Sequence, residues 1–399
     1  LTAATDGPLA AQVFKTAADP YVGKLTYLRV ISGVLKADSH VWNANKGADE
    51  RLGTLYVQRG KEQIAVPELR AGDIGVVAKL AATATGDTLC AREHQFMLPE
   101  IAFPSPVYSM SVHPTSKAGV DKLGPSLQRL VEEDPGLRLS RDPSTAEVIL
   151  AGLGDAHLDV TVERLKRKFG VEVELTLPRV PYRETVAKKG SGDYTHKKQT
   201  GGHGQYARVV IELNPLPRGS GLQFTEKVVG GAVPKEFIPA VEKGIMEAAT
   251  AGVFAGYELT DCQVVLFDGK HHPVDSSEMA FKLAASQALK EAVAAAGPQL
   301  LEPVMTIRVQ APELNAGDIV SDLNTKRAKI HGINPDGGMS VIEAEVPLAE
   351  VQRYASDLRS ITQGRGGFEL EFDHYGEVPG QIAQRVAAEH KKAIEEAHH

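Results

Sequence analysis

A basic, glycine-rich segment is the first part of the sequence whose residue types could do chemistry. Residues 188–208 contain five Lys or Arg residues and one Asp, a local charge of 5 − 1 = +4 in a chain whose net charge is −7. Glycines let a backbone come close to phosphate groups, and Lys, Arg and Gln donate hydrogen bonds to phosphates and 2′-hydroxyls. The pattern favours RNA contact, with a solvated glycine-rich hairpin as the alternative. The candidate residues are Lys197, Lys198, Gln199, Gly201, Gly202, His203, Gly204 and Gln205.

A second candidate segment lies about 70 residues further along the chain. Asp268-Gly269 is a turn signal after a strand expected over 263–267, and Ser276 or Ser277 can cap the helix that follows. These signals predict an exposed loop tip, which is either an RNA contact or an ordinary loop. Its candidate residues are Lys270, His271, His272 and Asp275.

A metal site is a further alternative for this segment, with His271, His272, Asp275 and His203 as ligands. Adjacent histidines in a loop rarely face the same ion, and the HxxxH spacing of a helical zinc site is absent. We therefore expect no metal site.

A third candidate is the loop over 360–368, between an expected helix and an expected strand. Gln363 and Arg365 could contact a phosphate backbone there, together with free backbone amides. A helix C-cap followed by a strand is the alternative.

Several classes of function are excluded by what the sequence lacks. The three Gly-Lys pairs are followed by Leu25, Glu62 and His271 rather than by Ser or Thr, so the chain holds no phosphate loop for a nucleotide. The net charge of −7 excludes a globally basic nucleic-acid binder, and two cysteines cannot form a disulfide framework. The N-terminus has no signal-peptide pattern and no apolar run spans a membrane, so we expect a cytoplasmic protein. The chain begins with Leu1 rather than Met, so we expect a fragment.

The periodicity of apolar residues predicts the elements that position these segments. Short β-rich runs with turn signals predict a β-barrel in the first hundred residues. Residues 107–176 and 303–374 each predict a β-α-β-β-α-β unit, the ferredoxin-like order, with a single helix expected over 348–358 in the second. Between them we expect a helix over about 234–250, with Pro234 in the first turn, and a second helix over 277–295 because that stretch is rich in alanine. A last helix begins near 381.

Short segments spread along essentially the whole chain match the pattern of one family in the same order. They are residues 18–25, 71–75, 132–135, 154–160, 199–206, 228–231, 274–281, 357–360, 362–366 and 373–375. On these segments the sequence resembles translation elongation factor G without its N-terminal GTPase domain.

The resemblance implies a multidomain α+β protein. It implies a translation-factor β-barrel over 1–103 (domain II), a ferredoxin-like domain over 104–178 (domain III) and a ferredoxin-like domain with a C-terminal helix over 299–399 (domain V). Domain IV, over 179–298, would have the fold of a ribosomal small-subunit protein, with a left-handed βαβ crossover and tip loops that reach the decoding site. His272 corresponds to the family's tip histidine.

The resemblance also implies the function. The chain would be the ribosome-binding part of a translational GTPase that promotes translocation of tRNA and mRNA during polypeptide elongation. Its partners would be rRNA, tRNA and mRNA at the A site of the small ribosomal subunit, together with the GTPase-associated region of the large one, with no membrane partner and a monomeric state. The chain itself would not be an enzyme and would hold no cofactor, because GTP and Mg²⁺ belong to the GTPase domain of the intact family protein.

Departures from the family pattern leave a second function open. His203 stands where many members have Arg, and Gly154-Asp155-Ala156-His157-Leu158 replaces the usual Gly-Glu-Leu-His-Leu. These changes favour considering an elongation-factor-G-like paralogue that acts in ribosome recycling or ribosome protection. A small-molecule enzyme is a third alternative, since some kinases share the fold of domain IV, but the chain has no matching phosphate loop.

Overall fold

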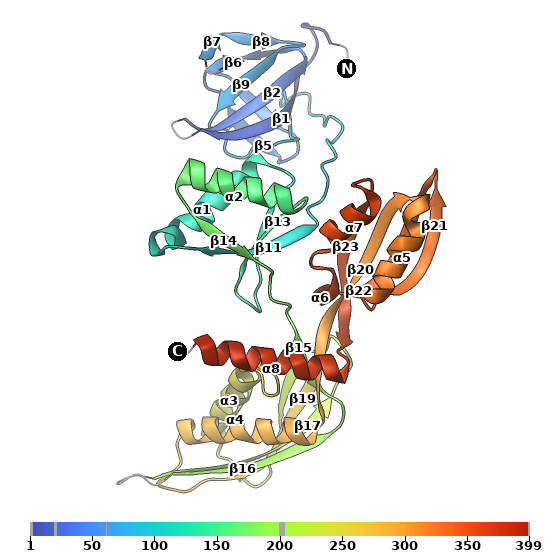
Figure 1. Ribbon diagram of the computed structural model, residues 1–399. Coiled ribbons are helices and arrows are strands. Elements are labelled where there is room, and N and C mark those ends of the chain that lie inside the picture. Colours follow the sequence, from blue (N-terminus) through green and yellow to red (C-terminus); the bar gives the residue numbers. More distant parts are fainter. Residues whose placement is uncertain (1–2, 20–21, 61, 199–203, 398–399) are drawn as a thin grey trace. The chain divides into compact units, whose positions relative to one another are not determined.

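The computed structural model describes residues 3–19, 22–60, 62–198 and 204–397 and divides into two compact units. The first unit comprises Leu1–Pro178 with Gln352–Asp357, and the second comprises Arg179–Val351 with Leu358–His399. Figure 1 shows both units and labels most of their helices and strands.

A curled antiparallel sheet, here called the barrel domain (residues 10–90), begins the first unit (Figure 1). Eight strands follow the order β5-β4-β10-β1-β2-β9-β6-β7, beside a separate pair β3-β8. Val13, Leu28, Leu55 and Val77 point from different strands into one core, as the expected barrel requires. The strands are β1 Ala10–Asp19, β2 Gly23–Ser32, β3 Val34–Lys36, β4 His40–Asn43, β5 Ala48–Arg51, β6 Leu55–Arg59, β7 Glu62–Val66, β8 Glu68–Arg70, β9 Ile74–Ala78 and β10 Thr88–Cys90.

The first ferredoxin-like domain (residues 108–176) has the strand order β12-β13-β11-β14. Ser116 caps its first helix by accepting a hydrogen bond from Gly119 N–H, and Gly170 ends its second helix in the left-handed conformation expected of a C-cap glycine. Its elements are β11 Tyr108–Pro114, α1 Lys117–Glu133, β12 Arg138–Arg141, β13 Val148–Gly152, α2 Asp155–Phe169 and β14 Val173–Thr176.

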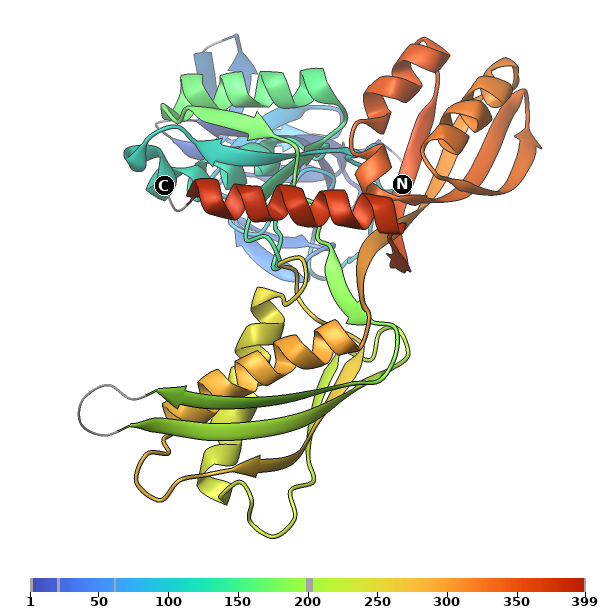
Figure 2. The same ribbon diagram turned by 60° about the horizontal axis from the view of Figure 1, so that its bottom comes forward.

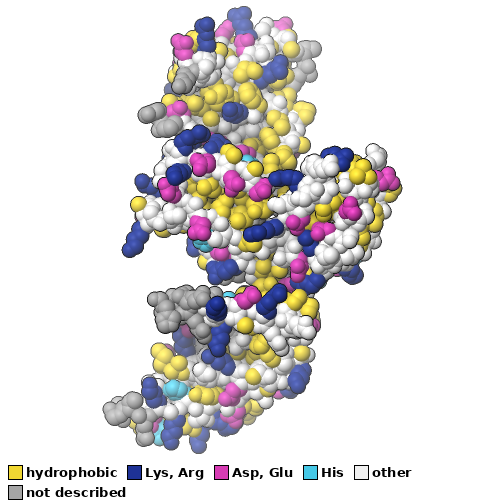
Figure 3. All heavy atoms as spheres, viewed as in Figure 1, with side chains coloured by type: hydrophobic (Ala, Val, Ile, Leu, Met, Phe, Trp, Pro, Cys, Tyr) yellow, Lys and Arg dark blue, Asp and Glu magenta, His cyan; other side chains and the backbone are white. Residues whose placement is uncertain are grey.

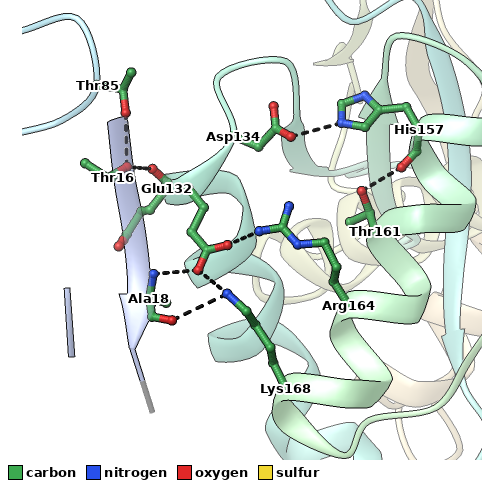
Figure 4. Close-up of polar contacts among 10 residues, drawn as sticks. Thr16, Ala18, Thr85, Glu132, Asp134, His157, Thr161, Arg164 and Lys168 are labelled. Carbon is green, nitrogen blue, oxygen red and sulfur yellow. Dashed lines mark hydrogen bonds and ion pairs between the residues drawn. The ribbon is translucent and has the colours of Figure 1, made fainter. Parts of the chain in front are cut away.

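One buried carboxylate joins this domain to the barrel domain (Figure 4). The Glu133 side chain, at the end of α1, is only 4% exposed. It accepts hydrogen bonds from the backbone N–H of Ala18 on β1 (2.5 Å), from Lys168 Nζ (2.6 Å) and from Arg164. Thr16 on β1 donates a further hydrogen bond to the carbonyl of Glu132. Strand β1 and helices α1 and α2 therefore meet at a single, fully paired acidic group.

The tip domain (residues 190–295) lies in the second unit. Its sheet has the order β16-β17-β19-β18, and two helices that pack against each other cover one face (Figure 2). The parallel pair β18 and β19 is connected through the first of these helices, as a βαβ crossover requires; its left hand stays a prediction. The elements are β16 Gly190–Lys198, β17 Gln205–Pro215, β18 Leu222–Glu226, η1 Lys235–Phe237, α3 Ile238–Ala251, β19 Cys262–Lys270 and α4 Glu278–Ala295.

Two local features of the tip domain differ from or refine the sequence prediction. Pro234 does not begin the α-helix: it precedes the 3₁₀ turn η1, and Pro239 lies in the first turn of α3 instead. Glycines on β16 allow a close approach of α4, because a Cβ at Gly192 would lie 2.0 Å from the carbonyl oxygen of Ala288. The hairpin β16-β17 is therefore packed directly on the backbone of α4.

The second ferredoxin-like domain (residues 298–377) repeats the first in its strand order, β23-β20-β22-β21. The helix expected over 348–358 is two helices separated by a turn at Gln352 and Arg353. The sequence could not reveal this turn, because buried Val351, Tyr354 and Leu358 keep helical spacing across it. The elements are β20 Pro298–Pro312, η2 Glu313–Asn315, α5 Ala316–Thr325, β21 Lys329–Asp336, β22 Met339–Pro347, α6 Leu348–Val351, α7 Tyr354–Thr362 and β23 Gly367–Glu377.

A short strand and the last helix form the base of the tip domain. Strand β15 (Arg183–Val186) pairs with the first residues of β20, and α8 (Gly380–Ala397) packs over Ala255, Leu300 and Val378. Fully buried Glu184 accepts four backbone hydrogen bonds of 2.6–3.0 Å from residues 253, 254, 255 and 257. Among the described residues, none of the helices combines the length and apolar character that crossing a membrane requires.

Candidate RNA interface

The two loops singled out in the sequence lie at the same end of the tip domain. Strand β17 is paired with β16 on one side and with β19 on the other, and the pairs Lys198–Gln205 and Arg208–Lys270 stand near that end. The first loop connects β16 to β17, and the second connects β19 to α4. Ser277 caps α4 by accepting a hydrogen bond from Ala280 N–H, as predicted, so the second loop ends at a fixed point.

Hydrogen bonds join the two loops directly. Tyr206 N–H donates to the carbonyl of Asp275 (2.8 Å), and the Ser276 hydroxyl donates to the carbonyl of Tyr206 (2.7 Å). Gly204 N–H donates to Oδ1 of Asp275 (3.0 Å). The second loop is thus fixed to Gly204 and to the start of β17, where the first loop ends. The residue pattern predicted no role for Tyr206 and indicated Ser276 only as a helix cap.

His272 lies in the second loop with its side chain 49% exposed. Its backbone N–H donates to the Ser276 hydroxyl (2.8 Å), and the backbone N–H groups of Val274 (3.3 Å) and Asp275 (3.2 Å) face its Nδ1 atom. The ring meets that of Tyr206 edge-on, with 6.3 Å between centroids. The loop therefore holds the imidazole in a defined orientation at the surface.

The positive charge of the tip comes from fewer residues than the sequence suggested. Arg208 donates two hydrogen bonds of 2.8 and 2.6 Å to Asp193, and this pairing holds the pKa of the Asp193 carboxyl below its usual range. Lys189 is paired with Glu212 at 2.6 Å. Lys197 and Lys198 at the end of β16 and Lys270 at the end of β19 are exposed.

The other predicted tip residues divide into three groups. His271 is exposed, whereas Gln205 is partly buried and its Oε1 accepts a hydrogen bond from Nε2 of His196 (2.9 Å), a contact that the sequence did not indicate. Gln199, Gly201, Gly202 and His203 lie outside the described residues. Figure 3 shows Lys, Arg and His side chains gathered at this end of the tip domain.

Asp268-Gly269 does not form the expected turn. Strand β19 continues to Lys270, with a β-bulge opposite Val210 and Ile211. Glycine is required at position 269 for packing, because a Cβ there would lie 2.5 Å from the carbonyl oxygen of Arg208 and from the Val233 side chain. Glycine occurs both in turns and at strand positions where another backbone approaches closely, so the Asp-Gly motif misplaced the end of the strand.

The third candidate loop is a helix C-cap in its backbone. Gln363 and Gly364 have positive φ angles after α7. The N–H groups of Gly364, Arg365 and Gly366 donate to Arg359 O, Thr362 O and Thr362 Oγ1, so these amides are not available to hold a phosphate. RNA contact by the side chains of Gln363 and Arg365 stays a prediction.

The described residues offer no cluster of three or more His, Cys, Asp or Glu side chains suited to a metal ion. His203, one of the four ligands considered, is not among the described residues. Both cysteines are buried, and burial raises the pKa of the Cys262 thiol to about 12. The arrangement of the tip is therefore suited to noncovalent contact with RNA through cations, an imidazole and backbone groups.

Comparisons with known protein families and structures cover nearly the whole chain. Four family models match, in order: elongation factor G domain 2 (residues 8–92), domain III (103–177), domain IV (178–297) and C-terminus (299–386). The chain is 46% identical over 383 residues to elongation factor G of Aquifex pyrophilus, covering 96% of this chain and 55% of that protein. It is 45% identical over 390 residues to an elongation factor G-like protein of Thermotoga maritima, covering 98% and 57%.

A solved structure from Thermus thermophilus superposes with a TM-score of 0.77 at 41% identity, covering 97% of this chain and 58% of that one. The chain thus spans little more than half the length of the relatives it matches. The matched models include both ferredoxin-like domains and the tip domain, in the order in which they occur along the chain. The chain belongs to the elongation factor G family.

Proposed function

We propose that this chain is the ribosome-binding part of a translational GTPase that promotes translocation of tRNA and mRNA. The observation that carries the proposal is the end of the tip domain, where the loop between β19 and α4 is hydrogen-bonded to Gly204 and Tyr206. The exposed residues there are Lys197 and Lys198 on β16, Lys270 on β19, and His271 and His272 in that loop. Such a tip suits insertion against RNA at the A site of the small ribosomal subunit, where its work is to occupy space and form contacts.

The partners follow from the same proposal. They are rRNA, tRNA and mRNA at the decoding site, together with the GTPase-associated region of the large ribosomal subunit, and the protein acts as a monomer. GTP and Mg²⁺ would be bound by a GTPase domain in the full-length protein, because the chain has no phosphate-loop sequence. Gln363 and Arg365 are proposed as additional RNA contacts in the second ferredoxin-like domain.

The test is His272→Ala in a full-length factor that includes this chain. Loss of an exposed loop side chain changes stability by less than about 0.5 kcal/mol, so the melting temperature should stay constant while single-round translocation slows. GTP turnover should be nearly unchanged. His94→Ala, which removes an exposed histidine from the loop after the barrel domain, is the matched control. An unchanged translocation rate in the His272 variant would contradict the proposal.

A second candidate function is ribosome recycling or ribosome protection. It is favoured by the 45% identity to a protein named elongation factor G-like and by the unusual residues at positions 155, 156 and 203. A translocation assay and an assay of ribosome splitting with the same full-length factor separate the two functions. Activity in splitting without activity in translocation would establish the second.

A further inference from the structure

Asp275 accepts two of the three hydrogen bonds that join the second loop to Gly204 and Tyr206. Its Oδ1 accepts from Gly204 N–H at 3.0 Å, and its backbone carbonyl accepts from Tyr206 N–H at 2.8 Å. Its Oδ2 lies 3.3 Å from Nδ1 of His272. The side chain of Asp275 is about two-thirds buried, with 32% of its surface exposed. A carboxylate so placed is poorly suited to touch RNA itself, because it would face the negative charge of the phosphates.

The surroundings of His272 decide which ring nitrogen faces outward. In the described part of the chain, both hydrogen bonds to the ring and its ion pair involve Nδ1, and Nε2 has no partner. Two backbone N–H groups donate to Nδ1 and one carboxylate oxygen lies at a similar distance from it, so two donors outweigh one acceptor and assign the lone pair of the neutral ring to Nδ1 and the proton to Nε2. In the protonated ring, Nδ1–H faces the Asp275 carboxylate and Nε2 keeps its proton. In both states Nε2 is a hydrogen-bond donor.

We propose that Asp275 is a positioning residue of the tip, which fixes the loop over 272–275 against Gly204 so that His272 presents an Nε2–H donor to an RNA phosphate oxygen. This inference rests on the proposed function, in which the tip contacts RNA. It replaces the direct RNA contact that the residue pattern predicted for Asp275. Two observations support the inference together. Oδ1 of Asp275 accepts a hydrogen bond from Gly204 N–H, and Nδ1 of His272 accepts hydrogen bonds from backbone N–H groups within residues 272–275.

The test compares Asp275→Ala with Asp275→Asn in the full-length factor. The alanine variant loses the anchor to Gly204, and we expect the maximal rate of translocation to fall about tenfold, as for the loss of one charge-assisted hydrogen bond in the transition state. The ribosome concentration that gives half the maximal rate should stay the same, because the lysines that supply binding are intact. Asn keeps an oxygen for Gly204 N–H, so the Asp275→Asn variant should recover most of the rate.

The control is Asp268→Ala, which removes a carboxylate on β19 that is 46% exposed and lies 3.8 Å from Arg208. Asp268→Ala removes one negative charge from the tip, as Asp275→Ala does, but leaves the contacts of His272 in place. The translocation rate of the Asp268→Ala factor should therefore match that of the unmodified factor. Melting temperatures of all variants report whether the tip domain stays folded.

A double variant separates this inference from the proposed function. If Asp275 acts through His272, Asp275→Ala in a His272→Ala background should produce little further loss of rate. A full tenfold further loss would show that Asp275 acts independently and would overturn the inference. A slow His272→Ala factor beside an unaffected Asp275→Ala factor would also overturn it, leaving the proposed function intact. A His272→Ala factor of normal rate would instead contradict the proposed function itself.

Discussion

Tyr257 illustrates how a single partly buried group connects the base of the tip domain to the last helix. Its ring lies 4.7 Å from that of His390 on α8 and 5.3 Å from that of Tyr182, measured between centroids. Burial is the main reason that the pKa of its hydroxyl is raised to about 12 from an ordinary value of 10. The folded chain therefore resists ionisation of a group that the unfolded chain ionises readily.

This shift predicts a loss of stability at alkaline pH. Because the folded pKa is the higher one, the contribution of Tyr257 is complete below pH 10 and is lost as the pH rises from 10 to about 12. Tyr257→Phe removes the titration, so urea unfolding of the variant should depend less on pH in this interval. Equal pH dependence of the two proteins would contradict the prediction.

At the scale of elements, close contact between β16 and α4 is the feature that makes the tip hairpin a firm structure. Gly192→Ala places a methyl group 2.0 Å from the carbonyl oxygen of Ala288, and such overpacking should lower the free energy of unfolding by about 1–3 kcal/mol. Gly317→Ala is the matched control, since position 317 lies in α5 with nothing within 4 Å of the added Cβ. The control should instead stabilise the protein by about 0.4–1 kcal/mol. Chemical unfolding measures both, and equal effects of the two substitutions would refute the packing argument.

The same scale shows what a sequence can and cannot predict. Apolar residues at helical spacing predicted α1 and α2, an alanine-rich stretch predicted α4, and Ser277 was one of the two expected caps of α4, because composition, spacing and capping are local properties of a sequence. The turn between α6 and α7 keeps its apolar residues at helical spacing, so the sequence pattern did not indicate that the helix is interrupted there.

In the candidate site, the two loops were predicted from residue types, but their joining was not. The bond from Gly204 to Asp275 spans 71 residues, and nothing local requires it. The pairing of Arg208 with Asp193 was missed for a similar reason, because a charge count does not show which charges neutralise each other.

At the scale of the whole molecule, the Glu133 contact predicts that the barrel domain and the first ferredoxin-like domain unfold together. Glu133→Gln leaves Arg164 and Lys168 without a carboxylate, and we expect a loss of about 1–3 kcal/mol. The chain has a single tryptophan, Trp42, which lies on β4, so its fluorescence reports the barrel domain. Its transition should move to lower urea in this variant and stay in place for Glu172→Gln, whose side chain is exposed. If Glu133→Gln leaves the urea midpoint of the Trp42 fluorescence transition unchanged, the two domains are not coupled through Glu133.

Binding of the chain to ribosomes should depend on salt through the tip lysines. With about three phosphate contacts and a slope of about 0.7–0.9 per contact, affinity should fall about 100- to 500-fold for each tenfold rise in salt. Lys270→Ala should reduce the slope by about one contact, whereas Lys290→Ala, an exposed lysine on α4, should not. Filter-binding titrations at several salt concentrations measure the slope. An affinity independent of salt would indicate docking through protein surfaces instead.

Strand β20 has a mechanical consequence for such a protein. Its first residues pair with β15 at the base of the tip domain, and its later residues form the middle of the second ferredoxin-like sheet. The tip domain is thus connected to the second ferredoxin-like domain through the β15-β20 ladder. Next to this ladder, four backbone N–H groups hold the side chain of Glu184 on β15. Hydrogen bonds in a ladder share a load applied along the strands, whereas bonds pulled apart in succession bear it one at a time. A load applied along β20 at the tip domain is therefore shared among the hydrogen bonds of two ladders that this one strand connects.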